Sequence, residues 1–221
     1  MRNILIVGAS GHSKMIVDSI LKTMSYNVVG YVDSYKTTGD IVYGHKILGS
    51  LKNLADLKIE YDIYGIIIGI GDNHLRKELK NKIDRLLLNL KYISVVHPSA
   101  ILANDVAVPK GTIIMAGAVV NANAKLGEFC ILNTKSSLGH DATMGSFSSL
   151  ASGVTVGGNV KIGYSSAICI GATIIQNISI GENTVIGAGS LVIENVGDFK
   201  QAFGVPITNI KNRNSDSKYL G

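Results

Sequence analysis

The chain has few cysteines and no long apolar segment. Its 221 residues contain only Cys130 and Cys169, too few for a disulfide framework, and we expect Cys130 to be a small buried side chain in a reducing, cytoplasmic setting. No apolar stretch reaches the ~18–20 residues that a membrane span needs, so we expect no membrane partner. The opening Met-Arg-Asn leads directly into apolar residues and a glycine turn, which argues against a signal peptide.

Charge is not concentrated either. The net charge is +5, but the densest basic cluster, residues 76–85, alternates with apolar residues at helical spacing and includes two acids. That pattern is typical of a solvated helix face, so we do not expect a nucleic-acid partner. A mildly positive field still suits a polyanionic small molecule such as a nucleotide sugar or coenzyme A.

A six-residue period dominates the second half of the chain. Every sixth residue from Leu102 to Val192 is aliphatic, without an insertion. The residue two places before each of these is never larger than Ile, and glycine follows seven of them. One large apolar residue, one small residue and a recurring turn glycine are the hexapeptide repeat of a parallel β-helix. Three repeats make one triangular coil, so core residues eighteen apart should stack.

The first half alternates strands with helices. Strands are expected at Ile4–Val7, Asn27–Val32, Ile63–Ile68 and Tyr92–Val96, helices at Gly11–Met24, Ser50–Leu57 and Asn73–Leu87, and a small hairpin within residues 26–48. This order predicts a small parallel, Rossmann-like sheet. His97-Pro98-Ser99 interrupts it, so we expect an α/β domain at 1–96 and a β-helix at 97–194. Residues 195–221 are expected to be a polar tail that leaves the β-helix and frays.

A glycine-containing turn, Gly8-Ala9-Ser10-Gly11-His12, joins the first strand to the first helix. Glycine lets a ligand approach the backbone closely, and a helix N-terminus offers free N–H groups to a phosphate. Ser10 and Ser13 replace the second and third glycines of the dinucleotide fingerprint, so the motif favours a nucleotide diphosphate over NAD. A tight turn without a ligand is the alternative.

Two more segments follow strands at the same sheet edge. Asp33 ends the second strand, where such folds place an acid that faces a nucleotide's ribose or base; a turn aspartate is the alternative. Gly69-Ile70-Gly71-Asp72-Asn73 follows the third strand, at the carboxyl edge where open α/β sheets bind ligands. Asp72 or Asn73 could also cap the next helix. We therefore expect Gly69 and Gly71 near the substrate.

The second candidate constellation is Gly139-His140-Asp141. His140 is the only histidine of the repeat region and lies two places after a core residue, near a corner of the coil. The adjacent carboxylate would orient and stabilise an imidazole that acts as a general base; an inert surface histidine is the alternative. With His97 the only other histidine nearby, the ligands are too few for zinc, so we expect no metal. No nucleophile-elbow motif supports a Ser-His-Asp triad.

Together these motifs resemble one family. The Gly8–His12 turn, Gly69–Asn73, Asn133-Thr134 with His140-Asp141, and Gly204-Val205-Pro206 look like the bacterial sugar acetyltransferases with a left-handed β-helix. Within that family the chain is most similar to the UDP-4-amino-sugar N-acetyltransferases of the bacillosamine pathway, with sialic acid O-acetyltransferases close by. The resemblance implies the left hand of the helix, a homotrimer with active sites between subunits, and acetyl-CoA as donor.

The resemblance also implies roles for single residues in catalysis, in binding the nucleotide sugar and in binding acetyl-CoA. His140 would be the general base and Asp141, where the family often has Glu, the acid that raises its basicity. Ser10, Gly11 and His12 would hold the UDP pyrophosphate and sugar, and Asp33 the uridine, although Ser34 replaces a second acid. Backbone groups of Ile170 and Ala188 would bind the pantetheine arm, and Ser149 stands where a family histidine contacts acetyl-CoA.

The resulting hypothesis is an acetyl-CoA-dependent N-acetyltransferase that acts on the amino group of a UDP-linked sugar in bacterial glycan biosynthesis. Two alternatives stay open. One is an O-acetyltransferase of a sialic acid or another sugar, which would use the same base; the nucleotide-like N-terminal motif favours nitrogen. The other is a non-catalytic trimeric partner of a sugar synthase, against which the His140-Asp141 pair argues.

Overall fold

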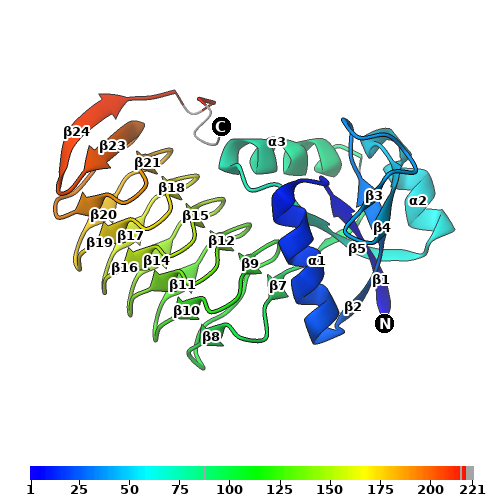
Figure 1. Cartoon of the computed structure of the whole chain (residues 1–221), viewed down its shortest axis with the longest axis horizontal. Coiled ribbons are helices and arrows are strands. Elements are labelled where there is room, and N and C mark those ends of the chain that lie inside the picture. The colour runs from blue at the N-terminus through cyan, green and yellow to red at the C-terminus, as the bar shows by residue number, and fades with distance from the viewer. Residues whose placement is uncertain (87, 215, 218–221) are drawn as a thin grey trace. The chain divides into compact units, whose positions relative to one another are not determined.

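The computed structural model describes residues 1–86, 88–214 and 216–217. It divides into two units (Figure 1): Met1–Gly71 with Leu75–Pro98, and Asp72–His74 with Ser99–Gly221. The first is an α/β unit and the second a left-handed β-helix, so the predicted fold class is confirmed. Within the described residues, no helix combines the length and the apolar character that crossing a membrane requires.

The α/β unit is built on a mostly parallel sheet in the order β3-β4-β2-β1-β5-β6. Its strands are β1 Arg2–Val7, β2 Tyr26–Val32, β3 Ile41–Val42, β4 His45–Gly49, β5 Ile63–Ile68 and β6 Lys91–Tyr92. Its helices are α1 Gly11–Thr23, α2 Leu54–Glu60 and, from Leu75 onward, α3 Asn73–Asp84. A 3₁₀ turn, Leu51–Asn53, precedes α2. The central strand β1 is apolar and buried because β2 and β5 pair with it in parallel on either side.

Two predicted boundaries of this unit differ from the structure. The expected strand at 92–96 is split into β6 and a separate strand β7, Val95–Val96. The third helix ends at Asp84, and its predicted end, Leu87, lies outside the described residues. The expected hairpin is present, because β3 and β4 pair antiparallel.

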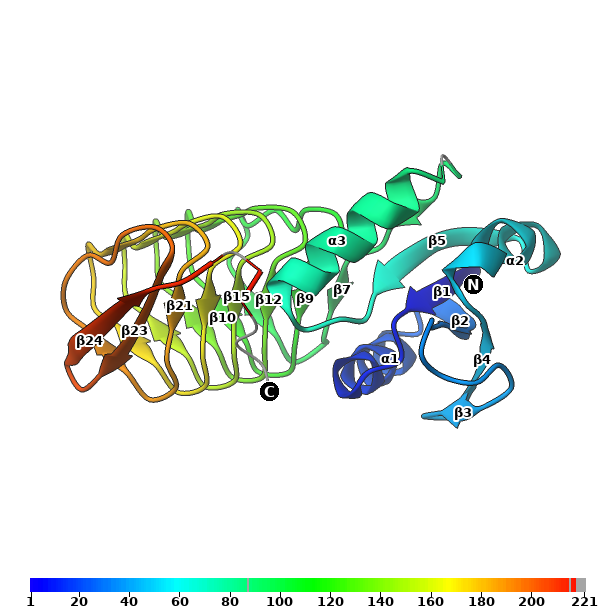
Figure 2. The ribbon, with the colours of Figure 1, turned by 90° about the horizontal axis from the view of Figure 1, so that it is seen from above.

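The β-helix consists of short strands in successive coils (Figure 2). Each strand has two residues, and from β9 onward the strands recur every six residues. They are β8 Ile101–Leu102, β9 Ile113–Ile114, β10 Val119–Val120, β11 Lys125–Leu126, β12 Ile131–Leu132, β13 Ser137–Leu138, β14 Thr143–Met144, β15 Ser149–Leu150, β16 Thr155–Val156, β17 Lys161–Ile162, β18 Ala167–Ile168, β19 Thr173–Ile174, β20 Ser179–Ile180, β21 Val185–Ile186 and β22 Leu191–Val192. Each ends on a predicted core aliphatic; Val108 alone of the sixteen ends no strand.

The strands stack on three faces with a register of eighteen residues. The first face holds β8, β10, β13, β16, β19 and β22, the second β11, β14, β17 and β20, and the third β9, β12, β15, β18 and β21. Leu138, for example, pairs with Val120 on one side and Val156 on the other. The predicted stacking of core residues eighteen apart is therefore confirmed.

The glycines that directly follow the core residues allow adjacent coils to pack closely; they are not needed for the conformation of a turn. From Gly111 to Gly189 the residue with positive φ lies three places after each core aliphatic. The glycine directly after the core residue has no positive φ; instead, a β-carbon on Gly163 would lie 2.5 Å from the backbone of Gly181 in the next coil. The expectation of a turn glycine is thus corrected, because these glycines are required by the contact between coils.

Small residues before the strands pack inside the coils, and their hydroxyls are satisfied there. Ser148 Oγ donates to Gly145 O at 2.6 Å, Ser166 Oγ to Gly181 O at 2.6 Å and Thr184 Oγ1 to Gly197 O at 2.7 Å. Burying a hydroxyl is costly unless it is hydrogen-bonded, so these contacts make serine and threonine acceptable in the core. Cys130 occupies the same kind of position and is fully buried, as predicted.

The C-terminal segment does not simply leave the β-helix. β23, Lys200–Gly204, pairs in parallel with β21, and β24, Ile207–Asn212, folds back antiparallel on β23. The expectation of a fraying tail is wrong over these strands. The physical reason is the open edge of β21, whose backbone groups find partners in β23 although the six-residue spacing has ended.

Candidate active site

Two loops of the α/β unit are packed tightly together at the carboxyl edge of its sheet. Gly8 follows β1 with φ +97°, and a β-carbon on it would lie 2.5 Å from the Ile70 side chain. A β-carbon on Gly69 would lie 2.6 Å from Gly8 O. The Gly8–His12 turn and the loop after β5 are therefore neighbours, as predicted from their place at the ends of adjacent strands, and Gly69 is needed for that closeness.

Ser10 precedes α1 in the N-cap position but does not cap it. Its hydroxyl donates instead to Gly69 O at 2.7 Å. The start of α1 therefore keeps N–H groups without a side-chain acceptor from Ser10, and a β-carbon at Gly11 would meet open space. Such a helix start is suited to a phosphate, because its N–H groups and the helix dipole both favour negative charge.

His12 lies in the first turn of α1, and its Nε2 is buried without a hydrogen-bond partner in the described part of the chain. Burial, and to a smaller extent the nearby positive charge of Arg76, lower the pKa of His12 to about 4. Its imidazole is therefore neutral at neutral pH. Arg76 itself is fully buried and donates through Nη1 to the carbonyls of Ile70, at 3.2 Å, and Gly71, at 2.8 Å.

Asp33 connects two segments of the same edge. Its Oδ2 accepts the Ala9 N–H at 2.7 Å, and its Oδ1 accepts the N–H groups of Tyr35, at 2.8 Å, and Lys36, at 3.1 Å. The alternative of a turn aspartate is thus realised in this geometry. A contact to the uridine stays a prediction, and it would have to be made by a carboxylate that already holds the Gly8–His12 turn.

In the β-helix, His140 and Asp141 follow β13 at a corner of the first face. His140 Nδ1 lies 2.7 Å from Asp141 Oδ2, and the two side chains are 70% and 51% exposed. The hydrogen bond from His140, and then that from Asn123 Nδ2 to Oδ1 at 3.3 Å, lower the pKa of Asp141. An ionised Asp141 accepts the Nδ1 proton, which leaves the lone pair of the neutral imidazole on Nε2.

The backbone makes this pair possible. Asp141 has φ +56°, a left-handed conformation that aspartate tolerates better than most residues. Its N–H donates to Ala122 O at 3.0 Å in the preceding coil, and His140 O accepts the Asn159 N–H at 2.8 Å from the next. The pair is therefore held by both neighbouring coils. The Asp141 side chain, although shorter than Glu, reaches the imidazole.

The three residues assigned to acetyl-CoA lie elsewhere on the β-helix. Ile170 and Ala188 follow β18 and β21 on the third face, both exposed and on adjacent coils, with Gly189 N–H donating to Ile170 O at 2.8 Å. Ser149 is half-buried in β15. His140 follows a strand of the first face, so one chain does not bring it to the same corner as Ile170 and Ala188.

Two neighbours of the His140-Asp141 pair were not predicted, namely Asn123 and Gly158. Asn123 lies eighteen residues before Asp141, and Gly158 lies eighteen residues after His140. The period of the sequence contains this information, since residues eighteen apart face each other on adjacent coils. Counting eighteen residues back from Asp141 gives Asn123, and counting eighteen forward from His140 gives Gly158.

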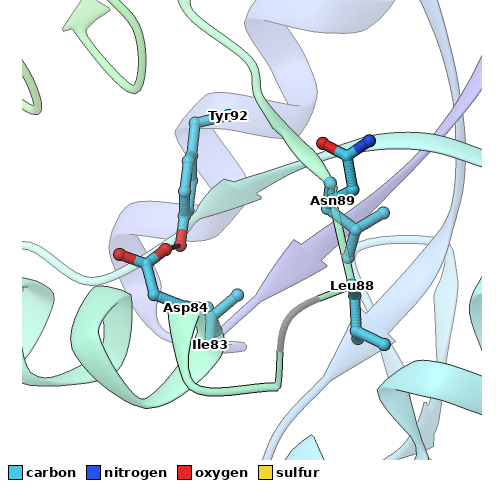
Figure 3. A pocket seen from close by; sticks show the side chains of 6 residues that line it. Ile83, Asp84, Leu88, Asn89 and Tyr92 are labelled. Atoms are coloured by element: carbon cyan, nitrogen blue, oxygen red, sulfur yellow. Dashed lines mark hydrogen bonds between the residues drawn. The ribbon is translucent and has the colours of Figure 1, made fainter.

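A pocket of about 340 Å³ in the α/β unit contains none of the predicted site residues (Figure 3). Its lining residues are Ile83, Asp84, Leu88, Asn89, Leu90 and Tyr92. Tyr92 Oη donates to Asp84 Oδ1 at 2.7 Å, and burial together with this carboxylate raises the pKa of Tyr92. Within the described residues, no three His, Cys, Asp or Glu side chains are placed to hold a metal ion.

Comparisons with known proteins match both units. Residues 3–83 match the family model of the PglD N-terminal domain. The perosamine N-acetyltransferase of Caulobacter crescentus, solved with CoA and GDP-perosamine, is 29% identical with a TM-score of 0.89 over 96% of this chain and 98% of that one. Over nearly its whole length the chain is therefore similar in fold to a sugar N-acetyltransferase with a left-handed β-helix.

Two other proteins show the same similarity. The acetyltransferase domain of PglB from Neisseria gonorrhoeae FA1090, solved with acetyl coenzyme A, is 27% identical with a TM-score of 0.86 over 94% of this chain and 98% of that one. UDP-N-acetylbacillosamine N-acetyltransferase of Bacillus subtilis (strain 168) is 31% identical over 118 residues, or 52% of each protein. The match to this curated relative thus spans about half its length. Two structures of the Caulobacter sugar acetyltransferase are of variants with one histidine replaced.

Proposed function

We propose that the protein transfers an acetyl group from acetyl-CoA to the amino group of a nucleotide-linked amino sugar, with a UDP-4-amino sugar as the substrate. The observation that carries the proposal is the 2.7 Å hydrogen bond between His140 and Asp141 at an exposed corner of the β-helix. Asp141 fixes the proton on Nδ1, so Nε2 keeps the free lone pair that a base needs. An inert surface histidine would not need this second group.

In the proposed reaction the sugar amine attacks the thioester carbonyl carbon of acetyl-CoA. The new N–C bond forms as the carbonyl becomes an oxyanion, which a backbone N–H stabilises. His140 Nε2 takes the amine proton, and Asp141 stabilises the resulting imidazolium. The oxyanion then collapses, the C–S bond breaks, and the proton on His140 passes to the leaving thiolate. The products are the acetamido sugar and CoA, and no acyl-enzyme forms.

The α/β unit is proposed to hold the nucleotide. Three features together support a diphosphate with a neutral polar group beside it: the start of α1 without a side-chain cap, the open space at Gly11, and the buried Nε2 of His12, which has no hydrogen-bond partner among the described residues. Relatives bind or are named for nucleotide sugars with different bases, GDP in the Caulobacter protein and UDP in the Bacillus one. Ser10, Gly11, His12, Asp33, Gly69 and Gly71 remain the proposed substrate residues.

The donor site is proposed to be shared between subunits of a homotrimer. His140 on one chain and Ile170 and Ala188 on another would then line one acetyl-CoA, because within one chain they occupy corners of different faces. Cyclic assembly pairs unlike surfaces of identical chains, so three equivalent sites would form. Ser149 would supply a hydroxyl to the donor in place of an imidazole.

The test is a panel of acceptors incubated with acetyl-CoA while free thiol is measured. UDP-, GDP- and dTDP-linked 4-amino sugars form one set, and the matching 4-hydroxy sugars and a sialic acid form the other. We expect thiol release with the UDP-4-amino sugar, and an acetamido product by mass spectrometry. Release only with hydroxyl acceptors would replace the proposal by O-acetylation. Absence of turnover with every acceptor would leave the non-catalytic alternative.

A further inference from the structure

Gly158 lies one coil after His140, directly beside its imidazole. The strands before them, β13 and β16, pair with a register of eighteen residues. A β-carbon built on Gly158 would fall 2.6 Å from His140 Cε1 and 3.0 Å from Cδ2, and closer still to Nε2. Two non-bonded heavy atoms cannot approach to such distances without a shift. The imidazole therefore occupies space that exists because residue 158 has no side chain.

Neither backbone conformation nor coil spacing explains this glycine. Gly158 does not have a positive φ, so an L-residue could adopt its conformation. The preceding Gly157 is different, because a β-carbon there would meet the backbone of Gln176 in the next coil. At Gly158 the three nearest atoms all belong to the His140 ring. The side chain of His140, rather than the β-helix, is what requires a glycine here.

The orientation of the ring makes this space relevant to chemistry. Asp141 binds Nδ1, so Nε2 is the nitrogen with the free lone pair. Nε2 is also the ring atom that a β-carbon at residue 158 would approach most closely. Any side chain at residue 158 would therefore fill the space against the basic nitrogen or turn the ring out of its hydrogen bond with Asp141.

We infer that Gly158 is a positioning residue for His140, which keeps Nε2 open to the acceptor while Nδ1 stays on Asp141. The inference rests on the proposed role of His140 as the base, but the placement of the ring can be measured without turnover. Gly158 acts through the absence of a β-carbon, so alanine is the smallest change that removes its effect while keeping the backbone N–H.

The experiment compares Gly158→Ala with Gly197→Ala, both alone and in a His140→Ala background. Gly197 is a matched control, because it also lacks a positive φ and its β-carbon would meet open space. We expect Gly158→Ala to lower kcat by roughly 10- to 10²-fold, the cost of a misplaced catalytic group. The KM for the nucleotide sugar and the thermal midpoint should stay unchanged, because the imidazole can swing aside. Gly197→Ala should leave kcat unchanged.

The double variant decides whether the effect passes through His140. If it does, Gly158→Ala causes no further loss in the His140→Ala background. An equal loss in both backgrounds, or a wild-type kcat for Gly158→Ala, would overturn the inference. Histidine NMR provides the reading that needs no activity: the His140 ring resonances should shift in Gly158→Ala and not in Gly197→Ala. If the His140 resonances shift in Gly158→Ala but the wild-type protein acetylates no acceptor, the contact between residue 158 and His140 is supported and only the proposed function is rejected.

Discussion

At the scale of single residues, the two candidate histidines are prepared for different tasks by their surroundings. His140 is exposed, and its Nδ1 is hydrogen-bonded to the Asp141 carboxylate. His12 Nε2 is buried and has no hydrogen-bond partner among the described residues; burial, and then the nearby Arg76 guanidinium, disfavour the charged imidazole. The proposed base and the proposed neutral polar contact thus differ in environment, one exposed beside a carboxylate and the other buried beside a cation.

Replacing His140 should reduce turnover strongly. We expect His140→Ala to lower kcat by roughly 10²–10⁴-fold, the range that a positioned general base supplies, with little change in KM for the nucleotide sugar. Asp141→Asn should cost less, because the proton acceptor remains. Higher pH should partly restore His140→Ala, since more of the amine acceptor is then neutral. Steady-state kinetics across pH checks this; wild-type turnover of His140→Ala with chemistry rate-limiting would contradict it.

Gly11→Val should separate nucleotide binding from folding. A side chain at residue 11 would project into open space at the start of α1, so the fold should be unchanged. The same side chain would occupy the approach of a phosphate to the helix N–H groups. Calorimetry should show UDP binding by the wild-type protein and at least tenfold weaker binding by the variant. Binding of NAD in place of UDP would contradict the assignment of the turn.

His12 should make the folded protein sensitive to acid. Its pKa is about 4 in the folded protein, against the ordinary histidine value of 6.5 in an unfolded chain. Between these values the unfolded chain binds the extra proton, so stability falls as the pH falls. Between about pH 7.5 and pH 5 this group should cost about 2 kcal/mol. Urea unfolding of His12→Gln should lose less stability over that interval than the wild-type protein. Parallel curves would contradict the burial of an uncharged imidazole.

At the scale of elements, the β-helix depends on the contact of glycine with the neighbouring coil. Gly163→Ala would place a β-carbon 2.5 Å from the Gly181 backbone, and backbone cannot move aside as a side chain can. We expect a loss of about 1–3 kcal/mol, as for other overpacked positions. Gly197→Ala, with open space, should cost much less. Chemical denaturation of both variants measures the difference, and equal stability would show that the coils tolerate a wider spacing.

Most of these elements could be predicted because their signals are local or strictly periodic. The alternation of strand and helix predicts the α/β unit, and the sixth-residue aliphatics predict all three faces of the β-helix. β23 could not be predicted, since Ala202 is a core residue that breaks the spacing and pairs with Ile186 only because that edge is open. The His140-Asp141 pair is adjacent in sequence, whereas the lowered pKa of His12 depends first on its burial in the fold and then on Arg76, sixty-four residues away.

At the scale of the whole molecule, the proposed assembly has a measurable mass. A homotrimer of 23.4 kDa chains would have a mass of about 70 kDa. Light scattering at micromolar concentration should give this value for the wild-type protein. Mixing His140→Ala with an inactive variant altered at the Ile170 corner should restore part of the activity, because some mixed trimers contain one intact shared site. A monomer that turns over its substrate would contradict the shared site.

Because each full turn of the β-helix takes eighteen residues, the position of a residue along the chain determines the face on which it lies. Removing six residues would turn everything beyond the deletion by one third of a revolution, so that the residues of one face would be carried to the next. Removing eighteen residues would move the same residues along the helix axis by one coil and leave each of them on the same face. Length changes between the corner of His140 and that of Ala188 can therefore be absorbed only in whole revolutions.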